Sequence, residues 1–325
     1  MFCVSCVFFA KLNIIFKKTI FCHVFYFRTQ SFYYFRTLNN RIMTTREAIL
    51  LLRSNLSSIH DLREIESMTR IIFEEVLLWK PVDIVMRDNE ELPAFFEVKL
   101  NEIMARLMRH EPLQYILGKA RFHGHDFVVT PSTLIPRPET EQLVDMIIDQ
   151  NPESDLSVLD IGTGSGCIAI SLARALKFAQ VTATDISPQA LAVAQQNAKA
   201  LKTQVKFAVQ DILHCPAPTE AWDIIVSNPP YITEREKAAI EPNVLDYEPH
   251  SALFVPDDNP MLFYQPIAAF AQRALKNGGR LYLEINRAMA QQVIDTLRAH
   301  RFGNIQAHND FNGNPRFVTA IKNNN

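Results

Sequence analysis

Length, composition and charge restrict the kinds of protein that this chain can be. Its 325 residues are 48% hydrophobic and 21% charged, a globular composition that is long enough for two domains. The formal charge is −2, but residues 1–42 hold six Lys and Arg and no acid, so residues 43–325 carry about −8. Proteins that bind duplex nucleic acid usually do so through a basic surface, and residues 43–325 are too acidic to supply one. We therefore expect no direct nucleic-acid binding.

The first 42 residues differ from the rest of the chain. They contain twelve of the 32 aromatic residues and three of the five cysteines. Three lysines interrupt their apolar runs, so we expect no membrane span, and a secretory signal would need a cleaner apolar core. We interpret residues 1–42 as a leader or unstructured extension upstream of Met43, with a targeting segment as the alternative. The two remaining cysteines, Cys167 and Cys215, suit a reducing cytoplasm.

Residues 43–118 are predicted to form a small helical domain that recognises the substrate. Apolar residues recur there at helical spacing, prolines separate the stretches, and no glycine occurs before Gly118. Over residues 119–140 the spacing of apolar residues changes from helical to alternating. This alternation predicts a β-hairpin that links the helical domain to the next domain. Acidic residues just after Pro138 suit the positive end of a helix that opens there.

From residue 156 onward, predicted strands and helices alternate. The expected strands are 158–161, 181–185, 205–209, 223–227, 280–285, 304–307 and 316–322, and the expected helices are 166–177, 188–201, 260–276 and 288–300. Such alternation produces a parallel sheet with helices on both faces. A strand buried on both faces must be apolar at successive positions, as Ile224–Val226 is. We therefore predict an α/β, Rossmann-like fold with a mostly parallel seven-stranded sheet for residues 141–325.

A glycine-rich loop follows the first of these strands. Three of the chain's nine glycines stand at alternate positions in Gly162-Thr163-Gly164-Ser165-Gly166. Glycine permits a sharp turn and lets a ligand approach the backbone closely. Because ligands bind at the carboxyl ends of the strands in open α/β sheets, we predict that these five residues bind a cofactor, with a purely structural turn as the alternative.

Acidic residues end the neighbouring strands at the same predicted edge. Asp185 can accept hydrogen bonds from a ribose, and Asp211 and Ile212 are placed to meet the edge and face of an adenine ring. Asp160 precedes the loop by two residues, and the loop spacing differs from the Gly-x-Gly-x-x-Gly of NAD enzymes. This pattern resembles the first motif of Rossmann-like methyltransferases, whose acid reaches the amino-acid end of S-adenosyl-L-methionine. We expect that cofactor, with S-adenosyl-L-homocysteine as its product.

The fourth strand runs into Asn228-Pro229-Pro230-Tyr231. Two prolines cannot continue a sheet ladder, so the loop is stiff and exposes its carbonyl groups. The Asn228 side-chain oxygen and the Pro229 carbonyl can together accept both hydrogens of an –NH2 group, and Tyr231 can pack on its flat face. Holding both hydrogens orients a delocalised nitrogen toward a methyl donor without a metal or a strong base. We therefore predict that these four residues catalyse methyl transfer to a planar nitrogen.

Other segments of the sequence indicate which family of methyltransferases the chain resembles. The Asn-Pro-Pro-Tyr motif is shared with DNA adenine methyltransferases, so it identifies a nitrogen acceptor rather than a substrate. Residues 112–118, the hairpin, and residues 134–141, 247–249 and 310–316 together resemble the HemK/PrmC family over about residues 44–322. The resemblance implies a class I methyltransferase fold in which Gly162 to Gly166, Asp185 and Ile212 line the cofactor. It also implies that Asn228 to Tyr231 bind an acceptor glutamine.

The resemblance further implies a substrate. The HemK/PrmC family methylates the side-chain nitrogen N5 of the glutamine in the Gly-Gly-Gln loop of class 1 peptide-chain release factors, which modulates translation termination. Release factors would then be the protein partner, in the cytoplasm. One departure is Asn286, where the family usually has glycine, and it concerns local turn geometry. Two alternatives remain: an N6-adenine methyltransferase acting on DNA or RNA, which would need a basic cleft, and a non-catalytic cofactor-binding scaffold, which would not need Asn228.

His123 and His125 have the spacing of metal ligands, but no third ligand accompanies them in the sequence. We therefore expect surface or turn histidines there and no metal site. Cys167 stands at the start of a predicted helix, where a thiol can be activated. Because no histidine pattern accompanies it, we expect it to be buried as a small apolar residue. Arg137, Glu139 and Glu141 suit either a border of the active site or a capping and salt-bridging role.

Overall fold

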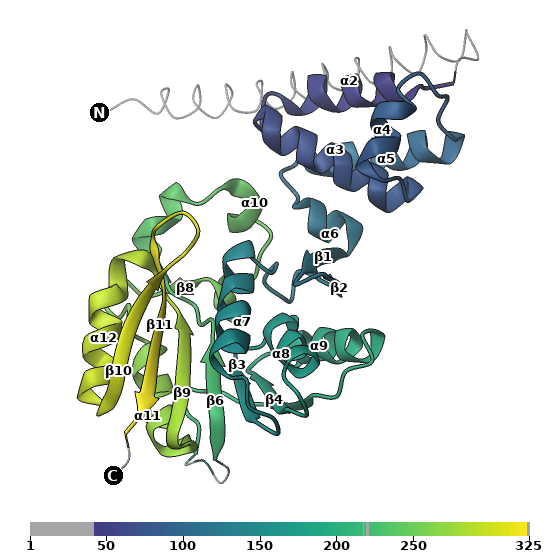
Figure 1. Ribbon diagram of the computed structural model, residues 1–325. Helices are drawn as coiled ribbons and strands as arrows, with labels where there is room; N and C mark the ends of the chain where they lie inside the picture. Colours follow the sequence, from purple (N-terminus) through teal and green to yellow (C-terminus); the bar gives the residue numbers. More distant parts are fainter. Residues whose placement is uncertain (1–41, 217, 219–220, 324–325) are drawn as a thin grey trace, which may run out of the picture. The chain divides into compact units, whose positions relative to one another are not determined.

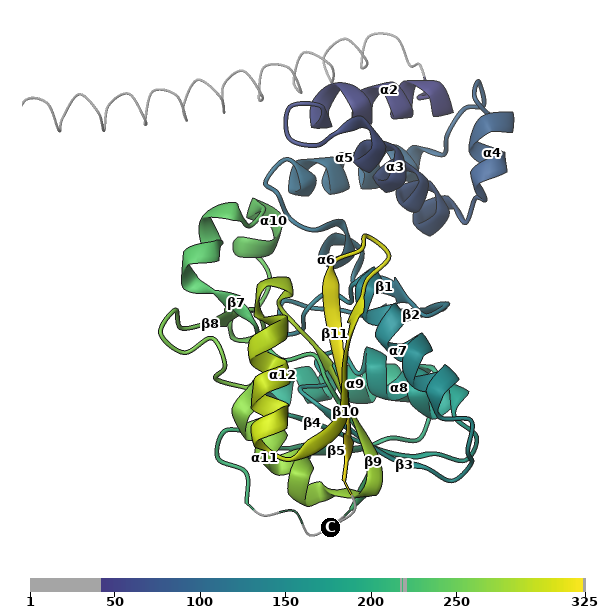
Figure 2. The same ribbon diagram turned by 60° about the vertical axis from the view of Figure 1, so that its left-hand side comes forward.

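The computed structural model describes residues 42–216, 218 and 221–323 (Figure 1, Figure 2). The leader predicted for residues 1–42 therefore lies, apart from Ile42, outside the described residues. The chain divides into two compact units, one ending at Ala105 and the other beginning at Arg106. Among the described residues, no helix is long and apolar enough to cross a bilayer.

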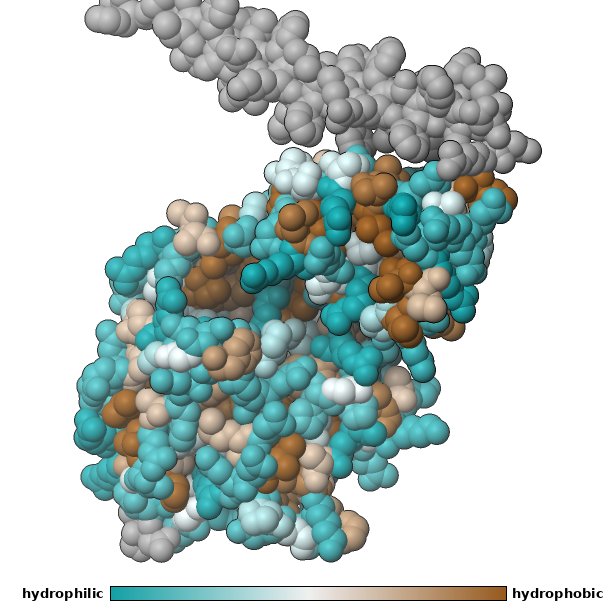
Figure 3. Space-filling model, turned by 45° about the horizontal axis from the view of Figure 1, so that its top comes forward, coloured by the Kyte–Doolittle hydropathy of each residue, from teal (hydrophilic) through white to brown (hydrophobic). Residues whose placement is uncertain are grey.

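The first unit is helical. Its helices are α2 (Thr45–Leu56), α3 (Leu62–Leu77), α4 (Pro81–Met86) and the first part of α5 (Ala94–Leu107). A capping box starts α2, where the Thr44 hydroxyl accepts from the Glu47 N–H and the Glu47 carboxylate accepts from the Thr44 N–H. Leu52, Ile72 and Phe96 are fully buried, one from each of three helices. By contrast, α4 buries none of its residues, and hydrophobic side chains appear in brown on the surface of this unit (Figure 3).

The second unit opens with a short helix and a hairpin. Helix α6 (Leu113–Leu117) leads into β1 (Lys119–Phe122), which pairs antiparallel with β2 (His125–Val128), so the predicted hairpin is confirmed. The buried side chain of Asn197 fastens this hairpin to the rest of the unit. Its amide exchanges two hydrogen bonds with the Val128 backbone and donates a third to the Ser165 carbonyl. The hairpin and the predicted glycine loop are therefore held by one side chain.

A mostly parallel seven-stranded sheet forms the centre of the second unit, as the sequence predicts. Its strands are β3 (Ser157–Ile161), β4 (Gln180–Asp185), β5 (Lys206–Val209), β6 (Trp222–Ser227), β9 (Leu275–Glu284), β10 (Phe302–Asn309) and β11 (Pro315–Lys322). Their order is β10-β11-β9-β6-β3-β4-β5, and β11 runs antiparallel to both of its neighbours. Strands β9, β6, β3, β4 and β5 are parallel, so their carboxyl ends meet at one edge.

Helices cover both faces of this sheet (Figure 1). They are α7 (Pro138–Gln150), α8 (Cys167–Ala175) and α9 (Pro188–Ala200), and on the opposite face α11 (Tyr264–Ala274) and α12 (Ala290–Ala299). Along β6, Ile224 and Val226 belong to the hydrophobic core on the side of α7, α8 and α9, and Ile225 belongs to the core on the side of α11 and α12. Alternate side chains of one strand are thus buried on opposite faces, which explains the continuous apolar run in the sequence.

The segment between β6 and α11 contains structure that the sequence does not predict. It holds β7 (Ile232–Thr233), η1 (Glu234–Ala239), α10 (Pro242–Leu245), η2 (His250–Ala252) and β8 (Phe254–Val255), and a further single turn, η3 (Arg287–Met289), precedes α12. Strands β7 and β8 pair in parallel. Elements of two to six residues are too short to show a period, so sequence reasoning had no signal for them.

Candidate active site

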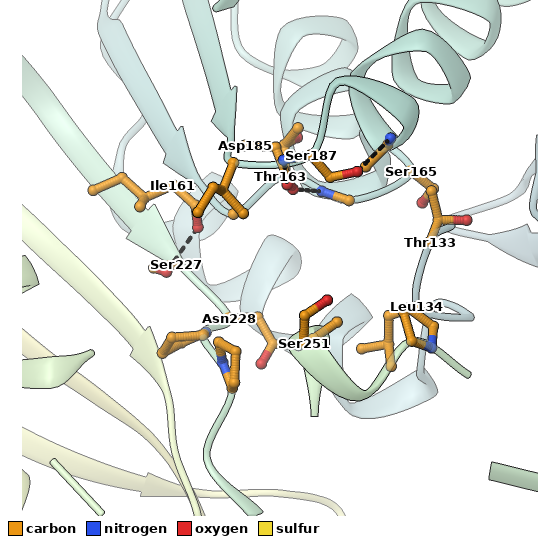
Figure 4. Close-up of a pocket in the computed structure, with 18 of the residues that line it drawn as sticks. Thr133, Leu134, Ile161, Thr163, Ser165, Asp185, Ser187, Ser227, Asn228 and Ser251 are labelled. Carbon is orange, nitrogen blue, oxygen red and sulfur yellow. Dashed lines mark hydrogen bonds between the residues drawn. The ribbon is translucent and has the colours of Figure 1, made fainter. Parts of the chain in front are cut away.

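A cavity of about 430 Å³ lies at the carboxyl ends of the central strands (Figure 4). Most of the residues predicted for the cofactor line it, namely Gly162, Thr163, Gly164, Ser165, Asp185, Asp211, Ile212 and Asn228. Pro229 and Pro230, which were predicted to act in catalysis, line it too. In Figure 4, Asp185 and Thr163 lie on one side of the cavity, and Asn228 and Ser251 lie on the other. Asp160, Gly166 and Tyr231 do not line this cavity. The topology thus brings the ends of four strands together around one space.

The glycine loop turns around the end of β4. The N–H groups of Gly162 and Thr163 both donate to the Thr184 carbonyl, at 2.8 and 2.9 Å. Gly164 donates to the Asp185 carboxylate at 2.9 Å. Gly166 donates to the Thr163 carbonyl, also at 2.9 Å. Because protein groups accept from these four N–H groups, they are not available to cradle a pyrophosphate, which disfavours a dinucleotide ligand.

Two glycines in this loop are required for different reasons. Gly164 has a φ of +55°, and an added Cβ would meet nothing within 4 Å, so the backbone there faces open space. Gly166 has a φ of +82°, and its Cβ would stand 3.0 Å from the Cβ of Ala194. The first leaves room for a ligand against the backbone, and the second lets α8 pack closely on α9.

Asp160 is completely buried behind the loop. One carboxylate oxygen accepts from the Thr163 hydroxyl at 2.7 Å and from the Ala169 N–H at 3.2 Å. The other oxygen has no partner among the described residues. Burial raises the pKa of Asp160 to about 7. The carboxyl group thus holds the glycine loop against the first turn of α8.

The two other acids differ in how they are held. Asp185 accepts from the N–H groups of Gly164 and Ser187, each at 2.9 Å, so both of its oxygens are oriented by backbone. Asp211 accepts from the Leu213 N–H at 2.9 Å and contacts the His214 ring at 2.7 Å. The hydrogen bond with His214 holds the pKa of Asp211 below its usual range. The Asp211 carboxylate therefore stays ionised beside the cavity.

The Asn228-Pro229 step borders two cavities. A second cavity of about 330 Å³ adjoins the first, and five residues line both: Leu134, Arg137, Asn228, Pro229 and Ala252. The second cavity is also lined by Tyr231, Ile232, Ala239, Ile240, Glu241, Val244, Leu253 and Glu284. Tyr231 is therefore placed on the side of the second cavity. Two molecules that occupy the two spaces would meet at Asn228.

Arg137 borders both cavities and forms an ion pair with Glu248, whose side chain is buried. The second oxygen of Glu248 accepts from the Ile135 N–H at 3.0 Å, so this acid fixes the segment that precedes α7. Glu141 instead accepts from the His123 N–H of the hairpin at 2.9 Å. Arg137 thus combines the two roles that the sequence left open, whereas Glu141 supports the hairpin.

Asn286 stands next to the loop Asn228–Tyr231, which we call the acceptor loop because it is predicted to bind the methyl acceptor. Its φ of −64° and ψ of 128° are ordinary for any residue, so a glycine is not required for this turn. Its side-chain N–H group donates to the Tyr231 carbonyl at 3.1 Å, and its side-chain oxygen accepts from the Ala288 N–H at 3.0 Å. The departure from the family pattern therefore adds a hydrogen bond between the end of β9 and the loop.

The histidines and the buried cysteine show structural contacts. His123 contacts Asp145 at 3.0 Å, and His125 accepts from Arg174 at 3.1 Å. In the part of the chain that the structure describes, no three His, Cys, Asp or Glu residues gather as a metal site. Cys167 is buried, as predicted, and burial raises the pKa of its thiol to about 12.

Comparison with known proteins identifies the family. A model of the PrmC N-terminal domain matches residues 47–118, and a model of the methyltransferase small domain matches residues 139–246. The release factor glutamine methyltransferase of Bacteroides thetaiotaomicron is 44% identical over 270 residues, which cover 83% of this chain and 97% of that protein. The chain belongs to the release factor glutamine methyltransferase family.

Other members of this family are similar over most of their length. The enzyme of Flavobacterium psychrophilum is 44% identical over 81% of this chain and 94% of its own. That of Enterococcus faecalis is 39% identical over 77% of this chain and 90% of its own. The chain is therefore an S-adenosylmethionine-dependent methyltransferase with the predicted class I fold.

The raised pKa of Asp160 predicts how stability depends on pH. Between about pH 4 and pH 7 the folded state keeps a proton that the unfolded state releases, so this group's contribution to stability falls as pH rises. Asp160→Asn has no such proton. We expect the variant to gain stability relative to the wild type across that window, measured as the difference in free energy of unfolding. Parallel pH profiles for the two proteins would contradict the assignment.

Proposed function

We propose that this protein transfers a methyl group from S-adenosylmethionine to the side-chain nitrogen N5 of the glutamine in the Gly-Gly-Gln loop of class 1 peptide-chain release factors. The observation that supports it most is the position of Asn228 and Pro229, which border both cavities. The relatives at 44% identity are named for this substrate, which favours a release factor over the adenine of DNA or RNA. We place the reaction in the cytoplasm, without direct nucleic-acid binding.

The first cavity fits S-adenosylmethionine. When bound, this molecule supplies a methyl group on a sulfonium. The open backbone at Gly164 and the Asp185 carboxylate would hold its polar parts, and Asp211 and Ile212 would meet its adenine. Ser165 also lines the cavity, although its hydroxyl oxygen is buried. Asp160 would act indirectly, by holding the loop.

The second cavity would hold the acceptor glutamine. The Asn228 side-chain oxygen and the Pro229 carbonyl accept the two hydrogens of its –NH2 group, and Tyr231 packs beside it. As the new N–CH3 bond formed, the bond from carbon to sulfur would break with its electron pair staying on the sulfur, and one amide hydrogen would leave as a proton to water. Alignment of this kind is worth about 7–11 kcal/mol of the barrier. Pro229 and Pro230 keep the loop stiff, so little alignment is lost to motion.

We further propose that residues 43–118 recognise the release factor, that 119–140 form the linker and that 141–325 form the methyltransferase domain. Helix α4 supports the first assignment. Val85 and Met86 of α4 are 75 and 78% exposed, and Leu78, which caps the preceding helix α3, is 85% exposed. Large apolar side chains exposed along one short stretch of chain are typical of protein interaction sites. An apolar surface suits a protein partner better than a nucleic acid.

Methyl transfer to a purified release factor tests the proposal. We expect labelled S-adenosylmethionine to give N5-methylglutamine within the Gly-Gly-Gln peptide, detected by mass spectrometry. Asn228→Ala should lower kcat by about a hundredfold or more while cofactor affinity stays within about tenfold, because Asn228 acts on the acceptor. Absence of transfer by a folded, cofactor-binding wild type would refute the substrate. An equal loss of cofactor binding in the variant would refute the division of roles.

Substitution on α4 tests the recognition surface separately. Met86→Asp places a charge on a helix that buries none of its residues, so we expect the fold to be unaffected. The KM for the whole release factor should rise about tenfold, and kcat/KM for a short Gly-Gly-Gln peptide should stay constant. Leu50→Asp, the same kind of change at an exposed apolar position on α2, serves as the matched control. Equal effects on factor and peptide would contradict recognition by α4.

A further inference from the structure

A buried carboxylate lies behind the acceptor loop. Glu284, at the end of β9, is only 1% exposed. One of its oxygens accepts from the Thr140 hydroxyl at 2.8 Å, and the other accepts from the Tyr231 hydroxyl at 3.1 Å. The Thr140 oxygen in turn accepts from the Asn228 side-chain N–H group at 3.4 Å. A single carboxylate thus connects to Asn228 and Tyr231, the two side chains that are proposed to hold the acceptor.

The direction of these hydrogen bonds follows from chemistry. An ionised carboxylate can only accept, so the single hydrogen of the Thr140 hydroxyl points to Glu284. The lone pairs of that hydroxyl remain for Asn228, and they require a donor. The Asn228 nitrogen therefore faces Thr140, and its oxygen Oδ1 is the atom left for the acceptor. A rotated amide would place two oxygens against each other without a hydrogen between them.

Several groups around Glu284 oppose the effect of its burial without cancelling it. Burial raises the pKa of Glu284, while the hydrogen bonds from Thr140 and Tyr231 and the positive charge of Arg316 act in the opposite direction. Arg316 is itself held at 3.3 Å from the buried carboxylate of Asp310. Burial also keeps the pKa of Tyr231 above its usual range, so its hydroxyl stays a donor. Both hydrogen-bond donors to Glu284 are thus maintained.

We propose that Glu284 and Thr140 are positioning residues that fix the orientation of the Asn228 amide, and so select an acceptor that donates two hydrogens, a primary amide. This inference rests on the proposed function and assigns part of its specificity. Neither residue needs to touch the acceptor nitrogen. With the Asn228 amide reversed, an N–H group would face the N–H groups of the glutamine, and the acceptor would lose one of its two hydrogen bonds.

Thr140 allows a conservative test. Thr140→Val keeps the shape and removes the hydroxyl, so the Asn228 amide is no longer oriented. We expect kcat for the release factor to fall about tenfold, with an unchanged dissociation constant for S-adenosylmethionine. Thr140→Ser retains the hydroxyl and should restore kcat to within about threefold of the wild type. In Glu284→Gln, the new side-chain –NH2 group would face either the Thr140 or the Tyr231 hydroxyl, both of which donate to Glu284 in the wild type. We therefore expect this variant to lower kcat at least as much as Thr140→Val.

Two comparisons distinguish an effect on the orientation of the Asn228 amide from a general loss of protein stability. Thr319→Val removes a mostly buried threonine hydroxyl on β11, whose partner is His308, and kcat should stay at the wild-type value. In the Asn228→Ala background, Thr140→Val should cause no further loss in single-turnover rate, because the group that it orients is absent. Additive losses, or a Thr140→Val enzyme with normal kcat, would overturn the inference alone. A wild type without transfer to the release factor would instead refute the proposed function.

Discussion

The proposed reaction depends on the two hydrogen bonds that Asn228 and Pro229 can accept from one –NH2 group. The residues around Asn228 must keep both oxygen atoms in place. An amide nitrogen is a poor nucleophile because its lone pair is delocalised into the carbonyl. Such a nitrogen reacts only when it is held and aimed, so the residues that hold it must be rigid and must have the correct polarity. Two prolines supply the rigidity. In our proposal, the hydrogen bonds from Asn228 to Thr140 and from Thr140 to Glu284 orient the Asn228 amide, so that its oxygen faces the acceptor.

Strand order explains why these groups meet the cofactor cavity. Strand β6 pairs in parallel with β3 on one side and with β9 on the other. The loop after β6 therefore lies between the glycine loop, which follows β3, and Glu284, which ends β9. In the proposed reaction, the glycine loop would position the methyl donor and Glu284 would help to position the acceptor. The hairpin is joined to the same arrangement through Asn197, which binds both Val128 and the carbonyl of Ser165.

Much of this fold and site is predictable from sequence because its signals are local. Burial on both faces gives continuous apolar strands such as Ile224–Val226, and the glycine and proline loops are contiguous motifs. The predicted sheet and family are confirmed, while the roles of individual site residues remain predictions. Thr140 and Glu284 stand 144 residues apart, and no local pattern shows that their side chains meet. The short elements between β6 and α11 were missed because they have no period.

The measurement that tests the central claim most directly is a crystal structure of the protein with S-adenosylhomocysteine and a peptide containing the Gly-Gly-Gln sequence. The glutamine nitrogen should lie about 3 Å from both the Asn228 side-chain oxygen and the Pro229 carbonyl oxygen, and should face the sulfur. The Asn228 nitrogen should still point to Thr140. A glutamine bound elsewhere, or an Asn228 oxygen turned away from it, would contradict the claim.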